Sequence, residues 1–317
     1  MYWEKMGKIF DPTEHNLPSK CFAFAKSPQA IVFNDFIRVY FSAAEKDEKN
    51  KLLSHVLYVD FDKKFKEILD ISSKEVISLG NMGCFDEHGI FPFNVYKEKN
   101  KIIAYTTGWN RKVSVSADAS IGFAQSFDSG KTFNKLGNGP ILTSSLNEPF
   151  LVGDAFVTKF KNIYHMWYIY GSKWINDINT KDSERVYKIA HADSKDGIKW
   201  NRDSKYIIPN ILGDNECQAL PTVIFYKNKY HMFFSYRNAF GFRSNKNDSY
   251  KTGYAYSNNL RNWVRDDSKV GIQLSSDGWD SEMMCYPFVF HCDDHIYMLY
   301  NGNEFGKYGF GLAVLRD

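Results

Sequence analysis

The sequence lacks the features that mark disulfide-rich, zinc-binding and membrane-spanning proteins. Its five cysteines are scattered along 317 residues without a CxxC pair, so neither a disulfide framework nor a zinc site is indicated. It has no apolar run of about 18 residues, which argues against a transmembrane helix. The opening stretch MYWEKMGKIFDP lacks the apolar core of a secretory signal. We therefore expect a cytoplasmic protein.

A strong charge imbalance is also missing. Lysine and arginine number 40 and aspartate and glutamate 37, which leaves a formal net charge of +3, and no block of basic residues is present. Nucleic acids and anionic membranes are therefore not expected as partners. Aromatic residues, in contrast, make up 17% of the chain, which suits β-rich packing or surfaces that stack on sugar rings.

Strand-like segments of similar sequence recur about every 65 residues. Five of them are centred 64, 63, 66 and 66 residues apart, near Val39, Ile103, Met166, Met232 and Met298. Each follows another β-rich segment, and the first four precede a third. An aromatic-led fourth element then appears, as in KWNRDSKYIIP and NWVRDDSKVGI. Four short strands per repeat predict an all-β fold, a five-bladed β-propeller with four antiparallel strands in each blade.

The last repeat ends after three strands, and the N-terminal segment has the pattern of the missing one. Trp3 aligns with Trp200, and Pro12 aligns with Pro209. We predict that the N-terminal strand completes blade five and closes the ring, which leaves no bare sheet edge. The expected organisation is a single propeller domain, residues 1–317, with blades at roughly 27–80, 81–142, 148–210, 215–272 and 282–317 plus 1–12.

Carboxylates stand just before the predicted inner strands of four blades. In a propeller these positions converge on one face around the axis, and such convergence is what a binding site needs. The residues at the five positions are Ser27, Asp86 with Glu87, Asp154, Glu216 and Glu282.

With these features the chain resembles the five-bladed propeller glycosidases, a group that includes arabinanases, xylosidases and invertases. The resemblance rests on the repeats, on the spacing of 62 residues between Asp154 and Glu216, and on the pair Glu216-Cys217, which is similar to the invertase acid motif. It implies that Glu216 is the general acid and that Asp154 orients it and stabilises the transition state. Glycosidic cleavage needs such a carboxyl group in its protonated form.

The chain departs from the pattern in its first blade. Where the resemblance implies an aspartate as base or nucleophile, the sequence has Ser27-Pro28, and serine cannot act as that base unaided. Asp86 is then the first choice for the base, and Glu282 is the second. Two alternatives remain: a glycoside phosphorylase or glycosyltransferase-like enzyme without a water-activating base, and a non-catalytic carbohydrate-binding propeller. A protein-interaction propeller is disfavoured by the convergent acids.

Further residues are expected to bind a saccharide or glycoconjugate substrate. Aromatic rings can stack on sugars, polar side chains can bind hydroxyl groups, and arginines can hold an anion. The expected substrate-binding residues are His88, Trp109, Trp174, Arg237, Arg243, Glu282 and Asn301. We expect no metal site and no required cofactor.

Overall fold

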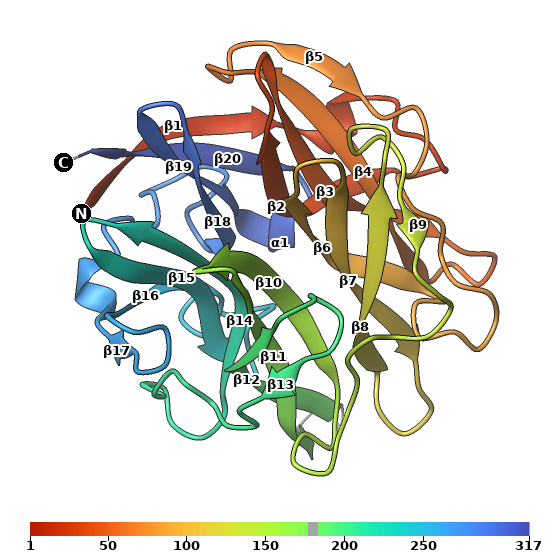
Figure 1. The fold of residues 1–317 in the computed structure, drawn as a ribbon, viewed down its shortest axis with the longest axis vertical. Coiled ribbons are helices and arrows are strands. Elements are labelled where there is room, and N and C mark those ends of the chain that lie inside the picture. Colours follow the sequence, from red (N-terminus) through yellow and green to blue (C-terminus); the bar gives the residue numbers. More distant parts are fainter. Residues whose placement is uncertain (177–182, 317) are drawn as a thin grey trace.

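Strand pairing in the computed structural model divides the chain into five antiparallel blades arranged around a centre (Figure 1). The structure describes residues 1–176 and 183–316. Three blades are separate four-stranded sheets, whereas the first two are joined into an eight-stranded sheet by one parallel bridge between Ser54 and Gly89. The predicted five-bladed β-propeller is therefore confirmed.

Each blade is built from four strands in the same order. The inner strands are β2 (Ala23–Val32), β6 (Gly89–Lys97), β10 (Val152–Phe160), β14 (Glu216–Tyr226) and β18 (Cys285–Cys292). The second strands are β3 (Phe36–Lys46), β7 (Ile102–Arg111), β11 (Ile163–Asn176), β15 (Lys229–Asn238) and β19 (His295–Asn301). The third strands are β4 (Leu52–Asp62), β8 (Ala117–Ser126), β12 (Ser183–Ser194), β16 (Lys251–Ser257) and β20 (Phe310–Arg316). The outer strands are β5 (Ile68–Ile71), β9 (Asn134–Lys135), β13 (Asn201–Arg202), β17 (Val264–Arg265) and β1 (Tyr2–Phe10).

Helical structure is confined to short turns in the described residues. These are the 3-10 turns η1 (Pro12–Glu14) and η2 (Asp267–Lys269) and the helix α1 (Asn303–Gly306). No helix in residues 1–176 and 183–316 has the length and apolar character needed to cross a bilayer. All five cysteines are free thiols.

The ring is closed by the two ends of the chain, which lie side by side in Figure 1. β1 pairs antiparallel with β20, with Trp3 opposite Leu315. Trp3 is 2% exposed and packs edge-on against Phe233 of blade four, with ring centres 5.4 Å apart. The N-terminal strand therefore completes blade five, as predicted.

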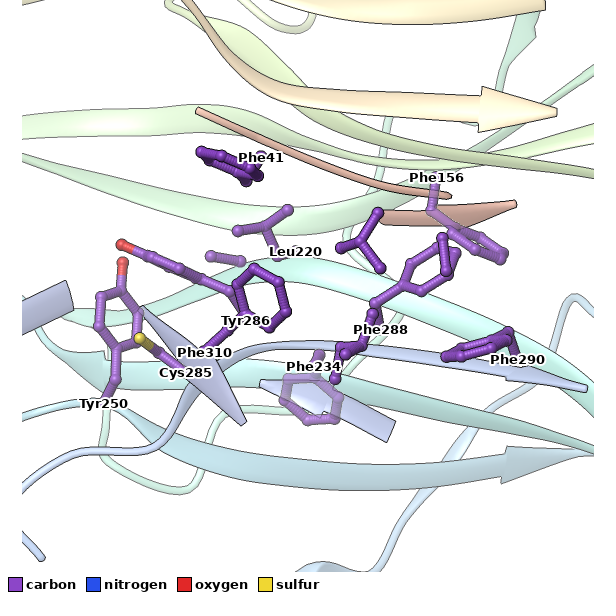
Figure 2. Close-up of a cluster of buried hydrophobic side chains, with 14 of the residues drawn as sticks. Phe41, Phe156, Leu220, Phe234, Tyr250, Cys285, Tyr286, Phe288, Phe290 and Phe310 are labelled. Atoms are coloured by element: carbon purple, nitrogen blue, oxygen red, sulfur yellow. The ribbon is translucent and has the colours of Figure 1, made fainter. Parts of the chain in front are cut away.

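The core fills the space between the blades. Because both faces of a blade are covered, its strands carry continuous apolar runs, and residues 37–44 of β3 are all buried. Phe41, Phe156, Leu220 and Phe288 come from four different blades and belong to one buried cluster (Figure 2).

Every inner strand contains a β-bulge at an equivalent place. The register breaks lie between Lys26 and Gln29, Ile90 and Phe93, Gly153 and Phe156, Ala219 and Thr222, and Cys285 and Phe288. The bulge residues are Ser27, Phe91, Asp154, Leu220 and Tyr286. Neighbouring inner strands contact one another in a closed circle. The bulges therefore define which residues are truly equivalent around the axis.

Replacing Trp3 by alanine is expected to destabilise the protein by about 3 to 5 kcal/mol, because a buried indole is removed and a cavity remains. Urea unfolding of both proteins measures the difference. Tyr2→Ala removes a side chain on the same strand that is 61% exposed. This control should change stability by less than about 0.5 kcal/mol. Equal stability of the parent and Trp3→Ala would contradict closure through this strand.

Candidate functional site at the propeller axis

Four blades share an ion pair between a buried carboxylate, which lies before the inner strand or at its first residue, and a base on the outer strand. We call these pairs the edge clasps: Asp86–Lys135, Glu148–Arg202, Glu216–Arg265 and Asp280–Lys5. Their bases occupy equivalent positions, each opposite an alanine of the third strand: Ala124, Ala192, Ala255 and Ala313. The repetition shows that these carboxylates tie the entry of a blade to its outer edge.

Glu216 has the surroundings of a structural carboxylate. It is fully buried, and its oxygens accept hydrogen bonds from Arg265 at 2.6 Å and from the Ile211 and Leu212 amides at 2.8 and 2.9 Å. Burial acts to raise the pKa of Glu216, but these bonds and one from Gln218 outweigh it and lower the pKa below the ordinary value. A carboxylate held in its ionised form does not fit the expected general acid.

Asp86 also belongs to an edge clasp. Its side chain is 1% exposed and pairs with Lys135, on the outer strand of the same blade. The expected role of Asp86 as a base is therefore not supported, because its carboxylate faces the blade edge and not the axis.

Asp154, unlike Glu216 and Asp86, is not part of an edge clasp. It is the one carboxylate among the five bulge residues, with φ of 52° and an exposed fraction of 8%. Its Oδ2 accepts a hydrogen bond of 3.3 Å from the Leu220 amide. Burial raises the pKa of Asp154 to about 7, against smaller opposing effects of this bond and of Arg185. Asp154 is therefore partly protonated at neutral pH and can donate a proton.

Hydrogen bonds between blades hold the bulges in place. The bulge amides donate to side chains on the second strand of the preceding blade: Ser27 to Asn301 at 2.8 Å, Asp154 to Thr107 at 2.7 Å and Tyr286 to Ser235 at 2.7 Å. Asn301 is fully buried, and its amide nitrogen donates to the Ala25 and Gly309 carbonyls at 2.8 Å. The expected substrate contact of Asn301 is therefore not supported, because its side-chain groups are used within the fold.

A cavity of about 580 Å³ opens where the segments of blades four, five and one meet. This volume lies in the range of small-molecule sites. Two of the predicted binding residues, Arg243 and Glu282, line it together with Phe24, Phe242 and Phe305. Phe305 and Glu304 both have positive φ, at 59° and 54°, a conformation that is strained for side chains of this size. We call this space the first cavity.

Arg237 lies behind the wall of the first cavity. It is 1% exposed, and its guanidinium carbon is 3.5 Å from the centre of the Phe242 ring. It donates to the Asn238 carbonyl at 2.7 Å and to the Tyr187 hydroxyl at 3.0 Å. Tyr187 in turn is 2.6 Å from the Tyr250 hydroxyl. Arg237 therefore supports the wall and does not present its charge to the cavity.

Aromatic side chains extend from the wall of the first cavity into the core. Tyr250 packs against Phe305 of the cavity wall, with ring centres 6.1 Å apart, and against Tyr286, at 5.5 Å. Figure 2 shows Tyr250 and Tyr286 next to each other, beside Cys285. Burial raises the pKa of Tyr286 strongly, and the neighbouring Tyr250 and Cys285 add to this effect. The sequence-based argument overlooked these tyrosines because nothing in their local sequence marks them.

The remaining predicted binding residues lie elsewhere. Trp174 lines a second cavity of about 460 Å³ between blades two and three, beside Phe150 and Val113. His88 and Trp109 stack on each other with ring centres 6.0 Å apart, and neither lines these two cavities. Burial, followed by the charge of Arg111, lowers the pKa of His88. The structure therefore brings His88 and Trp109 together, outside the walls of these two cavities.

Solved structures with the same architecture are carbohydrate-active enzymes. A glycoside hydrolase is 16% identical with a TM-score of 0.73, covering 99% of this chain and 93% of that one. A thermostable family-43 glycoside hydrolase is 15% identical with a TM-score of 0.67, covering 95% and 91%. A β-1,2-mannobiose phosphorylase from Listeria innocua, in complex with β-1,2-mannobiose, is 11% identical with a TM-score of 0.69, covering 99% and 96%. The chain thus has the five-bladed propeller fold of glycoside hydrolases and phosphorylases.

Sequence comparison identifies two relatives in Mycobacterium tuberculosis. The uncharacterized proteins Rv1502, of strain H37Rv, and MT1551, of strain CDC 1551, are each 30% identical over 317 residues, covering 100% of this chain and of the relative. The chain belongs to the family of these two proteins. No family model matches it.

Glu216→Gln is expected to lower the free energy of unfolding by about 1.5 to 3 kcal/mol, because the charge-assisted hydrogen bond to Arg265 is lost while the ion pair of Arg265 with Asp267 remains. Arg265→Met should have a similar effect. The double variant should lose less than the sum of the two, because both substitutions remove the same interaction. Urea unfolding at pH 7 supplies the three values, and strict additivity would contradict a coupled clasp.

Asp154→Asn should change how stability depends on pH. The pKa of Asp154 is about 7 in the folded chain against an ordinary 3.8, so the parent loses stability as the pH rises from about 4 to 7. Asparagine cannot ionise. The free energy of unfolding of the variant minus that of the parent should be larger at pH 8 than at pH 5, by roughly 2 to 3 kcal/mol. Asp118→Asn, at a half-exposed carboxylate, is the control. A stability difference between the parent and Asp154→Asn that does not vary with pH would show that Asp154 ionises normally.

Proposed function

We propose that this protein is a carbohydrate-active enzyme that cleaves a glycosidic bond at the propeller axis, with Asp154 as the proton donor. The observation that carries the proposal is a buried carboxylate, Asp154, on the bulge of an inner strand, with no ion pair among the described residues and a pKa that burial raises to about 7. A general acid works best when its pKa lies near the working pH. The fold shared with glycoside hydrolases and phosphorylases supports the reaction class.

Asp154 replaces Glu216 as the acid in this proposal. Glycosidic cleavage requires a proton on the leaving oxygen as the bond breaks. Glu216 is ionised and committed to Arg265, whereas Asp154 has one long hydrogen bond and no ion pair among the described residues. Phe24 and Phe242, in the wall of the first cavity, offer faces for a sugar ring.

If the reaction is hydrolysis, Glu282 is the residue that activates the water molecule. Its carboxylate is exposed and lines the first cavity, whereas Asp86 is held in an edge clasp. Phosphorolysis or transfer to an acceptor is the second candidate. It is favoured by Ser27, which stands at the axis in place of a base, and by the cation of Arg243 on the cavity wall.

Reducing-sugar release from a glycan panel, with and without inorganic phosphate, tests the assignment. Asp154→Asn should lower the rate by about 10² to 10⁴, the usual contribution of a general acid. Glu282→Gln should lower hydrolysis but leave phosphorolysis in place, since phosphate needs no activated water. Asp118→Asn serves as a matched carboxylate control. Parent-like turnover by Asp154→Asn would rule out its proposed role.

A further inference from the structure

Lys26 is a cation held between aromatic rings at the edge of the first cavity. It lies on β2 directly before Ser27. Its ammonium nitrogen is 4.2 Å from the centre of the Phe24 ring and 5.7 Å from that of Phe91. Within residues 1–176 and 183–316, no carboxylate forms an ion pair with it or shifts its pKa. A desolvated charge without a counter-ion is costly, so a negative charge from outside the chain would be stabilised here.

The other charges near Lys26 strengthen this preference. Burial lowers the pKa of Lys26 to about 8, the Cys285 thiol opposes this effect, and Arg243 adds to it. Arg243 lines the first cavity, and its guanidinium is 4.1 Å from the centre of the Phe242 ring. Its ion pair with Glu184, at 2.5 Å, leaves its side chain 59% exposed. An anion near both cations would relieve their mutual repulsion.

The first cavity joins this positive region to aromatic surfaces. Phe24 is both part of the cavity wall and a ring that contacts Lys26. A ligand that stacks on Phe24 therefore lies within reach of the ammonium group. Glu282 and Glu304 also line the cavity and are suited to hydroxyl groups rather than to an anion. One ligand with a sugar ring and a charged end matches both kinds of surface.

We propose that the first cavity binds a saccharide that itself carries an oxyanion, either a carboxylate or a phosphate ester, with Lys26 and Arg243 holding the anionic group. The rings of Phe24, Phe242 and Phe305 then face the sugar. This inference rests on the proposed function, because it names the class of saccharide on which that site would act.

Isothermal titration calorimetry with matched sugars tests the inference. The pairs are glucuronic acid with glucose, galacturonic acid with galactose, and the 6-phosphates of glucose and mannose with the parent sugars; inorganic phosphate is titrated alone. At least one charged sugar should bind 10-fold or more tightly than its neutral counterpart. Lys26→Met should abolish that advantage and leave the neutral sugars unchanged. Lys112→Met, at the second cavity, is the matched control and should retain it.

The pH dependence supplies a further readout. Because Lys26 loses its proton near pH 8, the advantage of the charged sugar should fall between pH 7 and pH 9.5 in the parent. Arg243, Glu282 and Glu304 are the other charged groups at this end of the cavity, and burial raises the pKa of Cys285 well above its ordinary value. Lys246, which also lines the cavity, is tested separately by Lys246→Met, which should leave the pH profile in place.

Three results would overturn the inference: no charged sugar binds better than its neutral partner, folded Lys26→Met keeps the preference, or inorganic phosphate alone binds as tightly as the sugar phosphates.

Arg243→Gln, at an exposed position, is the second variant should Lys26→Met fail to fold. It should weaken the binding of charged sugars 3-fold or more. All titrations are repeated in Asp154→Asn, where no turnover is expected. The preference for a charged sugar is therefore measured independently of whether Asp154 is the proton donor.

Discussion

Pairing between β1 and β20 is the contact on which the arrangement of the site depends. The inner strands of the five blades face one another only if the circle is complete, and the final sheet is complete only when the N-terminal strand joins it. Trp3 seals the boundary with blade four, while Lys5 forms the edge clasp of blade five with Asp280 at 2.6 Å. The positions of Ser27 and Asp154 across the axis follow from this closure.

Two sets of polar contacts then divide the carboxylates of the propeller into different classes. At the blade edges, the clasps pair buried acids with bases, and in Glu216 this surrounding lowers the pKa. At the axis, neutral hydrogen bonds between blades hold the bulges, so an acid placed there has no cation bound to it. Asp154 is in this second class, and its burial favours the protonated form. An aspartate at the blade edge is thus paired with a base and stabilises the fold, whereas Asp154 on the inner strand has no such partner in the described residues.

Repeat spacing predicted the fold because it depends on local patterns that the chain shows five times. The bulge residues keep the intervals of 64, 63, 66 and 66 that the strand centres have. The site was harder to predict, because Glu216 lies four residues before a bulge and Asp154 lies on one, and this difference sends their side chains to different places. A signal for the clasps was present: an aromatic residue followed two positions later by a base, as in Phe133-Asn134-Lys135, Trp200-Asn201-Arg202, Trp263-Val264-Arg265 and Trp3-Glu4-Lys5. The environment of Lys26 depends on Phe91, Cys285 and Arg243, which come from three other blades, and no local pattern encodes it.

Blade one is the exception to the clasp pattern. In the described part of the chain, Ile71 stands opposite Val59 where the other blades place a base opposite alanine, and β5 is largely exposed. The outer edge of this sector is held in the described residues by the pairing of β5 with β4 and by hydrogen bonds of Tyr58 with Asp70 and Ser72, and not by a clasp. Because Lys26 and Ser27 lie on the inner strand of this same blade, a blade that borders the first cavity is also the one whose outer strand could shift without breaking an edge clasp.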